Sequence, residues 1–401
     1  MIRKRACDIL FVTRIHLPEV AAATFRIAAV ENEVAKLGYQ IRALTTKVIG
    51  DNQQDESLVR LPVLRDSEGY VKGIIQYLSF DIPALFYLLV ASRPQIMVIE
   101  PPPTTGTIAR IAGTIRRVPY VWYAADVWSD ATASMGASRI VVRAVRAMEK
   151  FALKGAAGVI AVSDGVAERV NALGSRRTVI IPNGADTTIF NPRVKPFTRS
   201  ELARVGVVHP YFIYAGTASQ WQGAELFADA FVDYWEPDCD RQFVIVGRGD
   251  TFDYLNSVAD DLAARAHSAG VDYRPLIVLG QTDSVSAARW QRGALAATVS
   301  IRPGQGYDFA YPTKVLTALA CGTPVLYAGV GPATDDIITY DLGVSVPYNR
   351  HAVRSAFGQS WGEYSRDDHV ERLFTWVEKN RSMQATGQAA AKFIASCIPH
   401  R

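Results

Sequence analysis

The stretch AYPTKVLTALACGTPV, residues 310–325, shows in one place the order of helix, turn and strand that recurs along the chain. Pro312 can open a helix, because proline suits the first helical turn, where its missing amide hydrogen costs nothing. The Cys-Gly-Thr-Pro turn then leads into the apolar run PVLYAG (324–329), which predicts a buried strand. A helix followed closely by a short buried strand is the repeating unit of a parallel α/β sheet.

Short apolar runs of this kind recur along the chain, separated by longer segments of helical period. Many are continuous in valine and isoleucine, which is typical of strands covered on both faces, as in a parallel sheet. Strands are expected at 8–13, 41–45, 96–100, 120–125, 158–162, 178–182, 211–216, 242–247, 275–280, 297–303 and 324–329. The pattern predicts an α/β fold of two facing, doubly wound, Rossmann-like parallel-sheet domains, with a ligand cleft at the carboxyl ends of their strands.

A polar segment with two prolines, FNPRVKPFTRSEL (190–202), separates the two series of strands and predicts an interdomain linker. We therefore expect an N-terminal, acceptor-side domain at 1–190, a linker at 191–202 and a C-terminal, nucleotide-sugar-binding domain at 203–366. Residues 367–401 form an amphipathic helical pattern, which we expect to cross back to the N-terminal domain.

Composition limits the classes of partner. The 401 residues carry a net charge of +4, which is too weakly basic to indicate nucleic-acid binding. The four cysteines and six histidines are scattered, which indicates a reduced, cytoplasmic protein without a metal cofactor. Gln76, Asp81 and Pro83 interrupt the apolar segment at 73–90, which therefore predicts a buried or interfacial helix rather than a membrane span.

The chain has no Gly-x-Gly-x-x-Gly or phosphate-loop motif, which disfavours Rossmann dehydrogenases and P-loop enzymes. Other motifs, in order along the chain, resemble the retaining family 4 glycosyltransferases of GT-B fold: AVSDGVAERV (161–170), IPNGADTTIF (181–190), YAGTASQWQGAELFADAF (214–231), VIVGRGD (244–250) and TALACGTPV (317–325). Further segments are similar to the cell-envelope and O-antigen branch: LPEVAAATFRI (17–27), EPPPTTG (100–106) and ADVWSDATASMG (125–136).

The resemblance implies a nucleotide-sugar donor, whose diphosphate leaving group needs positive charge and amide N–H groups around it. We expect Lys314, with the first amides of the helix at Pro312, to hold the diphosphate, and Arg302 to supply a second cation. The alternatives are a surface lysine at an ordinary helix start and a surface ion pair for Arg302. The residues expected at the donor are Ala22, Ala23, Gly216, Thr217, Gln222, Gly247, Arg248, Gly280, Asp308, Phe309, Ala310, Tyr311, Pro312, Thr313 and Thr317.

Some of these positions depart from the family's pattern. Thr217 and Gln222 are neutral where many members have Arg and Lys. The family's pair of glutamates falls on Phe309 and Thr317, and the second glutamate normally grips the ribose hydroxyls. Asp308 is the candidate to replace the first acid. Losing one charge-assisted pair costs about 1.5–3 kcal/mol, so we expect the ribose to be held more weakly or differently, but not lost.

On the N-terminal side, Ala21–Ala23 follow the first strand, where family members often have glycines that approach the phosphates. Alanine permits close approach but disfavours positive φ. Arg26 lies one turn into the next helix and is expected on the acceptor or phosphate side, unless it is merely solvated. Asp126 is expected to contact the acceptor or to orient the sugar, and the alternative is that it caps the next helix.

The helix expected at 138–155 is basic along one face and apolar along the other. A basic amphipathic helix can lie on anionic lipid, although a solvated face over a buried one is the commoner explanation. The residues expected to contact a membrane are Arg139, Arg143, Arg146, Lys150 and Lys154.

Together these features predict a retaining, metal-independent glycosyltransferase, cytoplasmic or peripheral on the inner face of the membrane. It would move a sugar from a nucleotide-diphosphate donor, for which UDP is the family's commonest choice, to a cell-envelope glycan or polyprenyl-linked acceptor. In the family's mechanism the leaving phosphate helps to deprotonate the attacking hydroxyl. The alternatives are a non-catalytic GT-B paralogue that binds a partner transferase or a glycan, and a sugar-nucleotide epimerase, which would need acid and base side chains.

Overall fold

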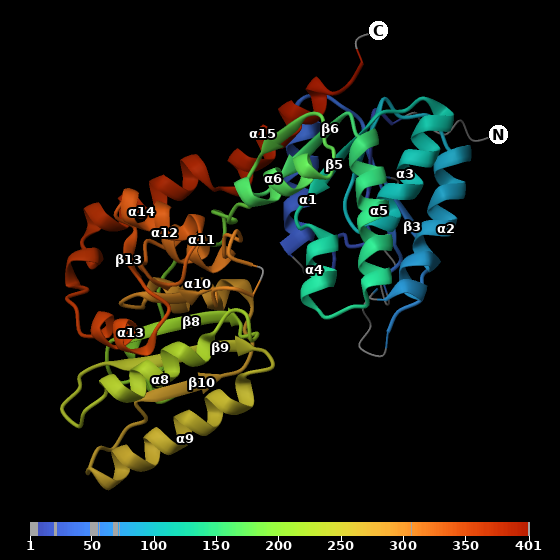
Figure 1. Cartoon of the computed structure of the whole chain (residues 1–401). Helices are drawn as coiled ribbons and strands as arrows, with labels where there is room; N and C mark the ends of the chain where they lie inside the picture. Colours follow the sequence, from blue (N-terminus) through green and yellow to red (C-terminus); the bar gives the residue numbers. More distant parts are fainter. Residues whose placement is uncertain are drawn as a thin grey trace. The chain divides into compact units, whose positions relative to one another are not determined.

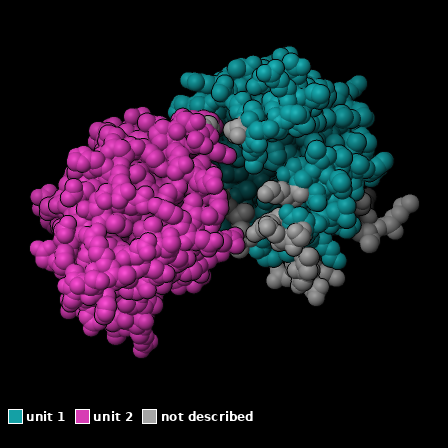
Figure 2. All heavy atoms as spheres, turned by 60° about the horizontal axis from the view of Figure 1, so that its bottom comes forward, with its two compact units in different colours: residues 1–183, 383–401 teal, residues 184–382 magenta. Residues whose placement is uncertain are grey.

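The computed structural model describes residues 7–19, 22–48, 55, 57–66, 71, 73–305 and 307–399. The chain divides into two compact units, which are coloured separately in Figure 2. Unit 1 comprises residues 1–183 and 383–401, and unit 2 comprises residues 184–382. The chain therefore leaves unit 1 after its sheet is formed and returns to it with one last segment.

Unit 1 is built on a seven-stranded parallel sheet in the order β3-β2-β1-β4-β5-β6-β7. Its strands are β1 (Ile9–Val12), β2 (Ile41–Thr46), β3 (Leu58–Leu61), β4 (Ile96–Ile99), β5 (Tyr120–Ala124), β6 (Gly158–Ala161) and β7 (Thr178–Ile180). Ile9 of β1 pairs with Ile41 of β2 on one side and with Ile96 of β4 on the other. The strand order reverses between β1 and β4, and such a switch point leaves a crevice beyond the carboxyl ends of the two strands.

The helices of unit 1 are α1 (Ala22–Lys36), α2 (Ile74–Val90), α3 (Pro103–Arg116), α4 (Trp128–Ser134), α5 (Arg139–Gly155), α6 (Asp164–Ala172) and α15 (Met383–Ser396). α15 packs along α1, although the two helices are far apart in sequence (Figure 1). Ile27 of α1 and Ile394 of α15 share one apolar core. A Cβ on Gly387 would lie 2.9 Å from the carbonyl oxygen of Ala29, so the close approach of these helices requires glycine there.

Unit 2 is built on a six-stranded parallel sheet in the order β10-β9-β8-β11-β12-β13. Its strands are β8 (Tyr211–Thr217), β9 (Gln242–Arg248), β10 (Leu276–Leu279), β11 (Ala297–Ser300), β12 (Val325–Ala328) and β13 (Gly343–Val346). Its helices are α7 (Arg199–Ala203), α8 (Ala224–Tyr234), α9 (Phe252–Ser268), α10 (Ser284–Arg292), α11 (Thr313–Ala320), α12 (Pro332–Thr339), α13 (Arg350–Phe357) and α14 (Asp367–Asn380), with a 3-10 turn η1 (Gly362–Ser365). The strand order reverses between β8 and β11, which creates a second crevice.

The two parallel sheets confirm the expected fold class, and every expected strand is present. The segment at 367–401 is divided between the units, because α14 belongs to unit 2 and α15 to unit 1. The domain bounds expected from the sequence stay predictions. No described helix combines the length and the apolar character that crossing a bilayer requires.

Candidate functional site

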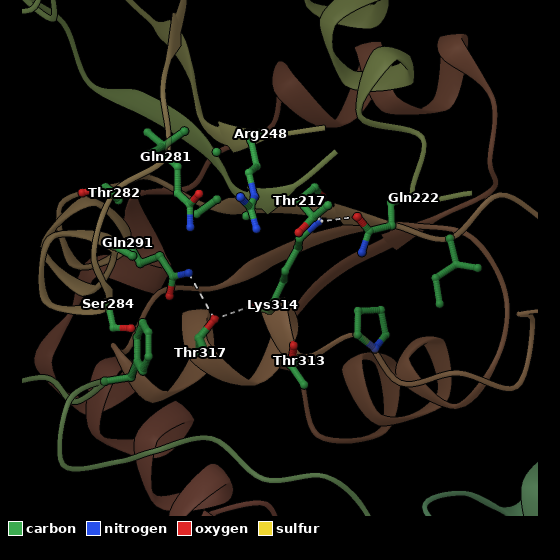
Figure 3. A pocket seen from close by; sticks show the side chains of 18 of the residues that line it. Thr217, Gln222, Arg248, Gln281, Thr282, Ser284, Gln291, Thr313, Lys314 and Thr317 are labelled. Carbon is green, nitrogen blue, oxygen red and sulfur yellow. Dashed lines mark hydrogen bonds between the residues drawn. The ribbon is translucent and has the colours of Figure 1, made fainter. Parts of the chain in front are cut away.

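Unit 2 contains a pocket of about 470 Å³ where β8 and β9 end and α11 begins (Figure 3). Many residues expected at the donor line it: Gly216, Thr217, Gln222, Gly247, Arg248, Ala310, Tyr311, Pro312, Thr313, Lys314 and Thr317. The sequence did not indicate the other lining residues: Phe190, Ala215, Trp221, Val246, Gln281, Thr282, Ser284, Ala287, Gln291 and Ile301. These residues are uncharged and come from segments scattered along unit 2, so no local motif marks them.

Lys314 lies in the first turn of α11, and neutral oxygen atoms surround its ammonium group. Its Nζ donates to the Tyr214 hydroxyl at 2.6 Å, to Gln222 Oε1 at 3.1 Å and to the carbonyl oxygen of Thr217. It also lies 4.2 Å from the centre of the Tyr214 ring. The two positions that lack the family's cations therefore hold Lys314 in place.

The charge of Lys314 has no counterion within the described part of unit 2. Burial therefore lowers the pKa of Lys314 from 10.5 to about 7. Pro312, which precedes α11, has no side chain that could cap the first amides of the helix. An anion at this helix end would meet both the ammonium group and free N–H groups.

Two glycines at the ends of β8 and β9 make room for this arrangement. A Cβ on Gly247 would lie 1.9 Å from the carbonyl oxygen of Gly216, and a Cβ on Gly216 would lie 2.8 Å from Cε of Lys314. Their φ angles of +156° and +126° are also ones that other residues rarely adopt. Glycine is therefore required where the backbone passes closely beside the pocket.

Thr317 lies one turn along α11 from Lys314 and contacts a side chain of α10. Gln291 Nε2 donates to Thr317 Oγ1 at 3.1 Å, and the Thr317 hydroxyl donates to the carbonyl oxygen of Lys314 at 3.1 Å. Gln291 is only 3% exposed, and its Oε1 has no hydrogen-bond partner. A buried acceptor without a donor costs about 1–3 kcal/mol.

Two arginines of unit 2 differ in where they lie. Arg248, at the end of β9, points into the pocket toward Lys314 (Figure 3). Arg302 is not among the lining residues; it pairs with Glu225 at 2.9 Å and bonds to the Tyr348 hydroxyl at 3.3 Å. These contacts agree with the alternative interpretation of Arg302 as a member of a surface ion pair. A catalytic role for Arg302 stays a prediction, and its place outside the pocket does not favour that role.

Three residues of unit 2 that were expected at the donor, Gly280, Asp308 and Phe309, are also absent from the lining. The carboxylate of Asp308 accepts hydrogen bonds from the amide of Gly304 at 3.0 and 3.2 Å, so it stabilises its own loop. Contact between the donor and any of these residues stays a prediction.

Unit 1 contains a pocket of about 230 Å³ at the ends of β1, β4 and β5. It is lined by Thr13, Arg14, Ile15, Ala23, Arg26, Val71, Tyr77, Glu100, Pro101, Ala125, Asp126 and Trp128. Ala23, Arg26 and Asp126 are among these residues. Ala22 and Ala23 were expected at the donor, and that contact stays a prediction. Ala22 begins α1, and Ala21 lies outside the described residues.

Arg26 is held in an ion pair rather than solvated, and its side chain is 12% exposed. Its Nη2 donates to Glu100 Oε1 at 2.7 Å, and its Nη1 donates to Asn183 Oδ1 at 3.2 Å. The other oxygen of Glu100 accepts from the Thr13 hydroxyl at 3.0 Å. Burial alone would lower the pKa of Arg26, but Glu100 raises it on balance. The pair therefore remains charged at the pocket wall.

Asp126 follows β5 and lies at the pocket, but it does not cap α4. The first two amides of α4 donate instead to Glu149 of α5, at 2.8 and 3.1 Å. Desolvation by the surrounding protein raises the pKa of Asp126; Arg26 opposes this rise and Glu100 adds to it. The Asp126 carboxylate is thus left available to a ligand.

The basic side chains of α5 are all exposed: Arg139, Arg143, Arg146, Lys150 and Lys154. Arg146 also pairs with Asp130 of α4 at 3.5 Å. A surface pair of this kind contributes little to stability, and contact of this helix with a membrane stays a prediction.

Two family models match the chain in succession. One, described as "Glycosyl transferase 4-like domain", matches residues 23–184, and the other, "Glycosyl transferases group 1", matches residues 209–356. The GDP-mannose-dependent alpha-(1-6)-phosphatidylinositol dimannoside mannosyltransferase of Mycobacterium tuberculosis is 28% identical over 233 residues. That match covers 56% of this chain and 55% of the relative, so the chain spans about half the length of this curated protein.

Solved structures show the same fold over nearly the whole chain. Sucrose-phosphate synthase from Thermosynechococcus elongatus superposes with a TM-score of 0.70 at 16% identity, covering 97% of this chain and 98% of that one. HepE from Anabaena, in complex with UDP, superposes with a TM-score of 0.68 at 15% identity, covering 97% and 100%. The two family models in chain order and the two parallel sheets together show that the chain belongs to family 4 of the glycosyltransferases, with the GT-B fold.

Proposed function

We propose that this protein is a retaining, metal-independent glycosyltransferase that moves a sugar from a UDP-sugar to a cell-envelope glycan or a lipid-linked acceptor. The observation that carries the proposal is the uncompensated ammonium group of Lys314 at the start of α11. A diphosphate would supply the missing negative charge there. That charge grows as the glycosidic bond breaks, so Lys314, Arg248 and the α11 amides would stabilise the transition state more than the bound donor.

The other end of the pocket suits a ribose. We infer that a ribose hydroxyl donates to Gln291 Oε1, the buried acceptor that has no partner, beside Thr317. Neutral groups would then replace the carboxylate of other family members. UDP is bound in the structure of HepE, whereas the name of the mycobacterial relative specifies GDP-mannose, so GDP is the competing base.

The alternatives make different demands on the pocket of unit 2. An epimerase needs both an acid and a base side chain. The residues that the structure describes along this pocket include no aspartate, glutamate or histidine, so Lys314, with a pKa of about 7, would have to serve without a carboxylate or imidazole partner. A non-catalytic paralogue remains the second candidate, because Phe309 and Thr317 stand where the family has two carboxylates.

A thermal-shift panel tests the proposed function. The full chain is melted in EDTA with UDP, GDP, ADP, dTDP and their common nucleotide sugars. We expect UDP to stabilise it most, because a ligand at 100 times its Kd adds about 2.7 kcal/mol to the free energy of unfolding. A selective shift with GDP would change the base, and no shift with any nucleotide at millimolar concentration would favour the non-catalytic paralogue. Release of UDP with an altered sugar, in the absence of acceptor, would indicate an epimerase.

We also propose that unit 1 binds an anionic membrane surface through α2 and α5, which both pack against α3. α2 exposes a series of large apolar side chains: Ile74, Ile75, Leu78, Ile82, Phe86 and Val90. Soluble monomers rarely expose contiguous apolar surface unless it binds something. The basic face of α5 adds attraction to anionic lipid, and the two together are the combination that holds a protein on a bilayer surface.

Cosedimentation with vesicles checks the membrane proposal. The double variant Arg143→Ala with Lys150→Ala should bind phosphatidylglycerol-containing vesicles about 30-fold more weakly, because each basic residue near the surface contributes about 1 kcal/mol. Phe86→Ser should weaken binding by removing apolar contact. Arg354→Ala, an exposed arginine of unit 2, is the matched control. If the double variant binds as well as this control does, α5 is not a lipid-binding face.

A further inference from the structure

Arg14 is a buried cation without a direct counterion in the pocket of unit 1. It directly follows the loop residue Thr13 at the end of β1, is 7% exposed and lines the pocket. Its guanidinium group stacks over the ring of Tyr77, 3.8 Å from the ring centre. Its Nε and Nη1 atoms have no hydrogen-bond partner.

The two neighbouring carboxylates bond to other residues and not to Arg14. Glu100 accepts hydrogen bonds from Arg26 and Thr13. Asp81, which is 1% exposed, accepts a hydrogen bond from Thr105 at 2.7 Å through Oδ1, while its buried Oδ2 has no hydrogen-bond partner. No acidic side chain in the described part of unit 1 lies within ion-pair distance of Arg14, although both Asp81 and Glu100 act on it through space.

Burying an arginine in this way costs free energy. Burial lowers the pKa of Arg14 to about 10, although Asp81, Tyr77 and Glu100 each act to raise it. Arg26 shows the contrasting case in the same pocket, because its contact with Glu100 compensates its charge. A cation held without a partner at a pocket wall is an arrangement that an anionic ligand completes.

We propose that Arg14 forms an anion subsite, and that the acceptor carries a phosphate or carboxylate group which this arginine binds. This inference rests on the proposed function, since it names the class of acceptor. Tyr77 and Trp128, whose ring centres lie 6.0 Å apart, provide an aromatic wall beside the anion. Asp126 lines the same pocket and would accept a hydrogen bond from an acceptor hydroxyl. The charge-assisted bond orients the acceptor through a group that does not itself react.

Inorganic phosphate is the first probe, because it needs no knowledge of the acceptor. The full chain is saturated with UDP, so that the pocket of unit 2 is occupied, and is then titrated with phosphate while its melting is followed. Phosphate should stabilise the wild type. Arg14→Gln should bind phosphate about 10- to 100-fold more weakly, which is the loss of one charge-assisted hydrogen bond. Arg14→Lys should retain part of the binding, and Arg176→Gln, an exposed arginine of the same unit, should behave as the wild type.

Two further ligands identify the source of the anion. Stabilisation by glucose 6-phosphate that depends on Arg14 would indicate a soluble sugar phosphate. Binding to phosphatidylglycerol vesicles that depends on Arg14 would indicate a lipid headgroup, and stabilisation by glucuronate but not glucose would indicate a carboxylate. Each of these outcomes supports the subsite.

The phosphate titration can also contradict the proposed subsite. No effect of phosphate on the wild type, or an equal effect on Arg14→Gln, would overturn it. A parallel loss of UDP affinity in Arg14→Gln would overturn it too, because Arg14 would then contact the donor. Melting in the absence of phosphate shows whether each variant is folded. If UDP fails to bind the wild type while the Arg14-dependent phosphate effect persists, the proposed donor fails and the subsite stands.

Discussion

Replacing Lys314 by methionine should weaken UDP binding about 100-fold and leave the protein folded. Methionine keeps an unbranched stem of similar length and removes the ammonium group, whose contacts with a diphosphate are charge-assisted and contribute about 1.5–3 kcal/mol each. The substitution removes three hydrogen bonds to neutral oxygen atoms, but it also removes a half-buried charge that has no counterion, so unit 2 should lose little stability. Titration calorimetry measures the affinity. Arg139→Ala, on the exposed face of α5, should bind UDP normally, and a similar loss in both variants would refute the phosphate assignment.

The same lysine gives the free protein a characteristic pH dependence. The unfolded chain keeps the ordinary pKa of 10.5, whereas the folded protein has a pKa of about 7 at Lys314. Between these values the unfolded state binds more protons, so stability should rise with pH relative to Lys314→Met. UDP favours the charged form, and its binding at pH 8 should therefore take up a proton and weaken as the pH rises. Calorimetry in two buffers of different ionisation enthalpy measures this uptake, which Lys314→Met should lack.

Asp126→Asn should lower turnover about 100- to 1,000-fold, with UDP affinity unchanged. The carboxylate lies at the pocket of unit 1 without a hydrogen bond in the described structure, and a lost charged contact in a transition state typically has this effect. Because the pKa of Asp126 is raised, wild-type turnover should fall with decreasing pH at values above those usual for an aspartate. The residual turnover of Asp126→Asn should not show this fall at low pH.

Asp164→Asn is the matched control for this carboxylate, because Asp164 is exposed in the first turn of α6. Its turnover and its pH profile should remain those of the wild type. Unchanged turnover in Asp126→Asn would show that the pocket does not take part in transfer, whatever it binds.

Most of the architecture follows from local patterns. Runs such as ILFV and VLYA are apolar throughout, and they become interior strands buried on both faces. The two strands that the sequence did not indicate, β3 (LVRL) and β13 (GVSV), lie at sheet edges and are only partly buried. The other two edge strands, β7 (TVI) and β10 (LIVL), were expected because they belong to continuous apolar runs. In β3 an arginine interrupts the run, and in β13 a glycine and a serine do, so neither segment stands out as a strand.

The candidate sites were only partly predictable from the sequence. Lys314 and Thr317 share one motif and one helix, so spacing alone brings them together. Gln291 reaches Thr317 from another helix, and Arg14 has only one local signal, a charged residue near the carboxyl end of a buried strand. The neutral residues Thr217 and Gln222 suggested a weakened site, yet they accept hydrogen bonds from Lys314. The fold determines which oxygen atoms accept hydrogen bonds from a lysine, and the sequence alone does not show them.

The packing of α15 against α1 has a consequence for how the protein is made. The ribosome delivers the strands of unit 1 first, and α1 can pack on them at once, but the part of α1 that α15 covers stays exposed until residues 383–401 have emerged. All of unit 2 is synthesised in between and can complete its own sheet during that time. Unit 1 is therefore the first unit to be synthesised and the last to complete its fold. A nascent chain stopped at residue 382 would expose the uncovered surface of α1 to chaperones.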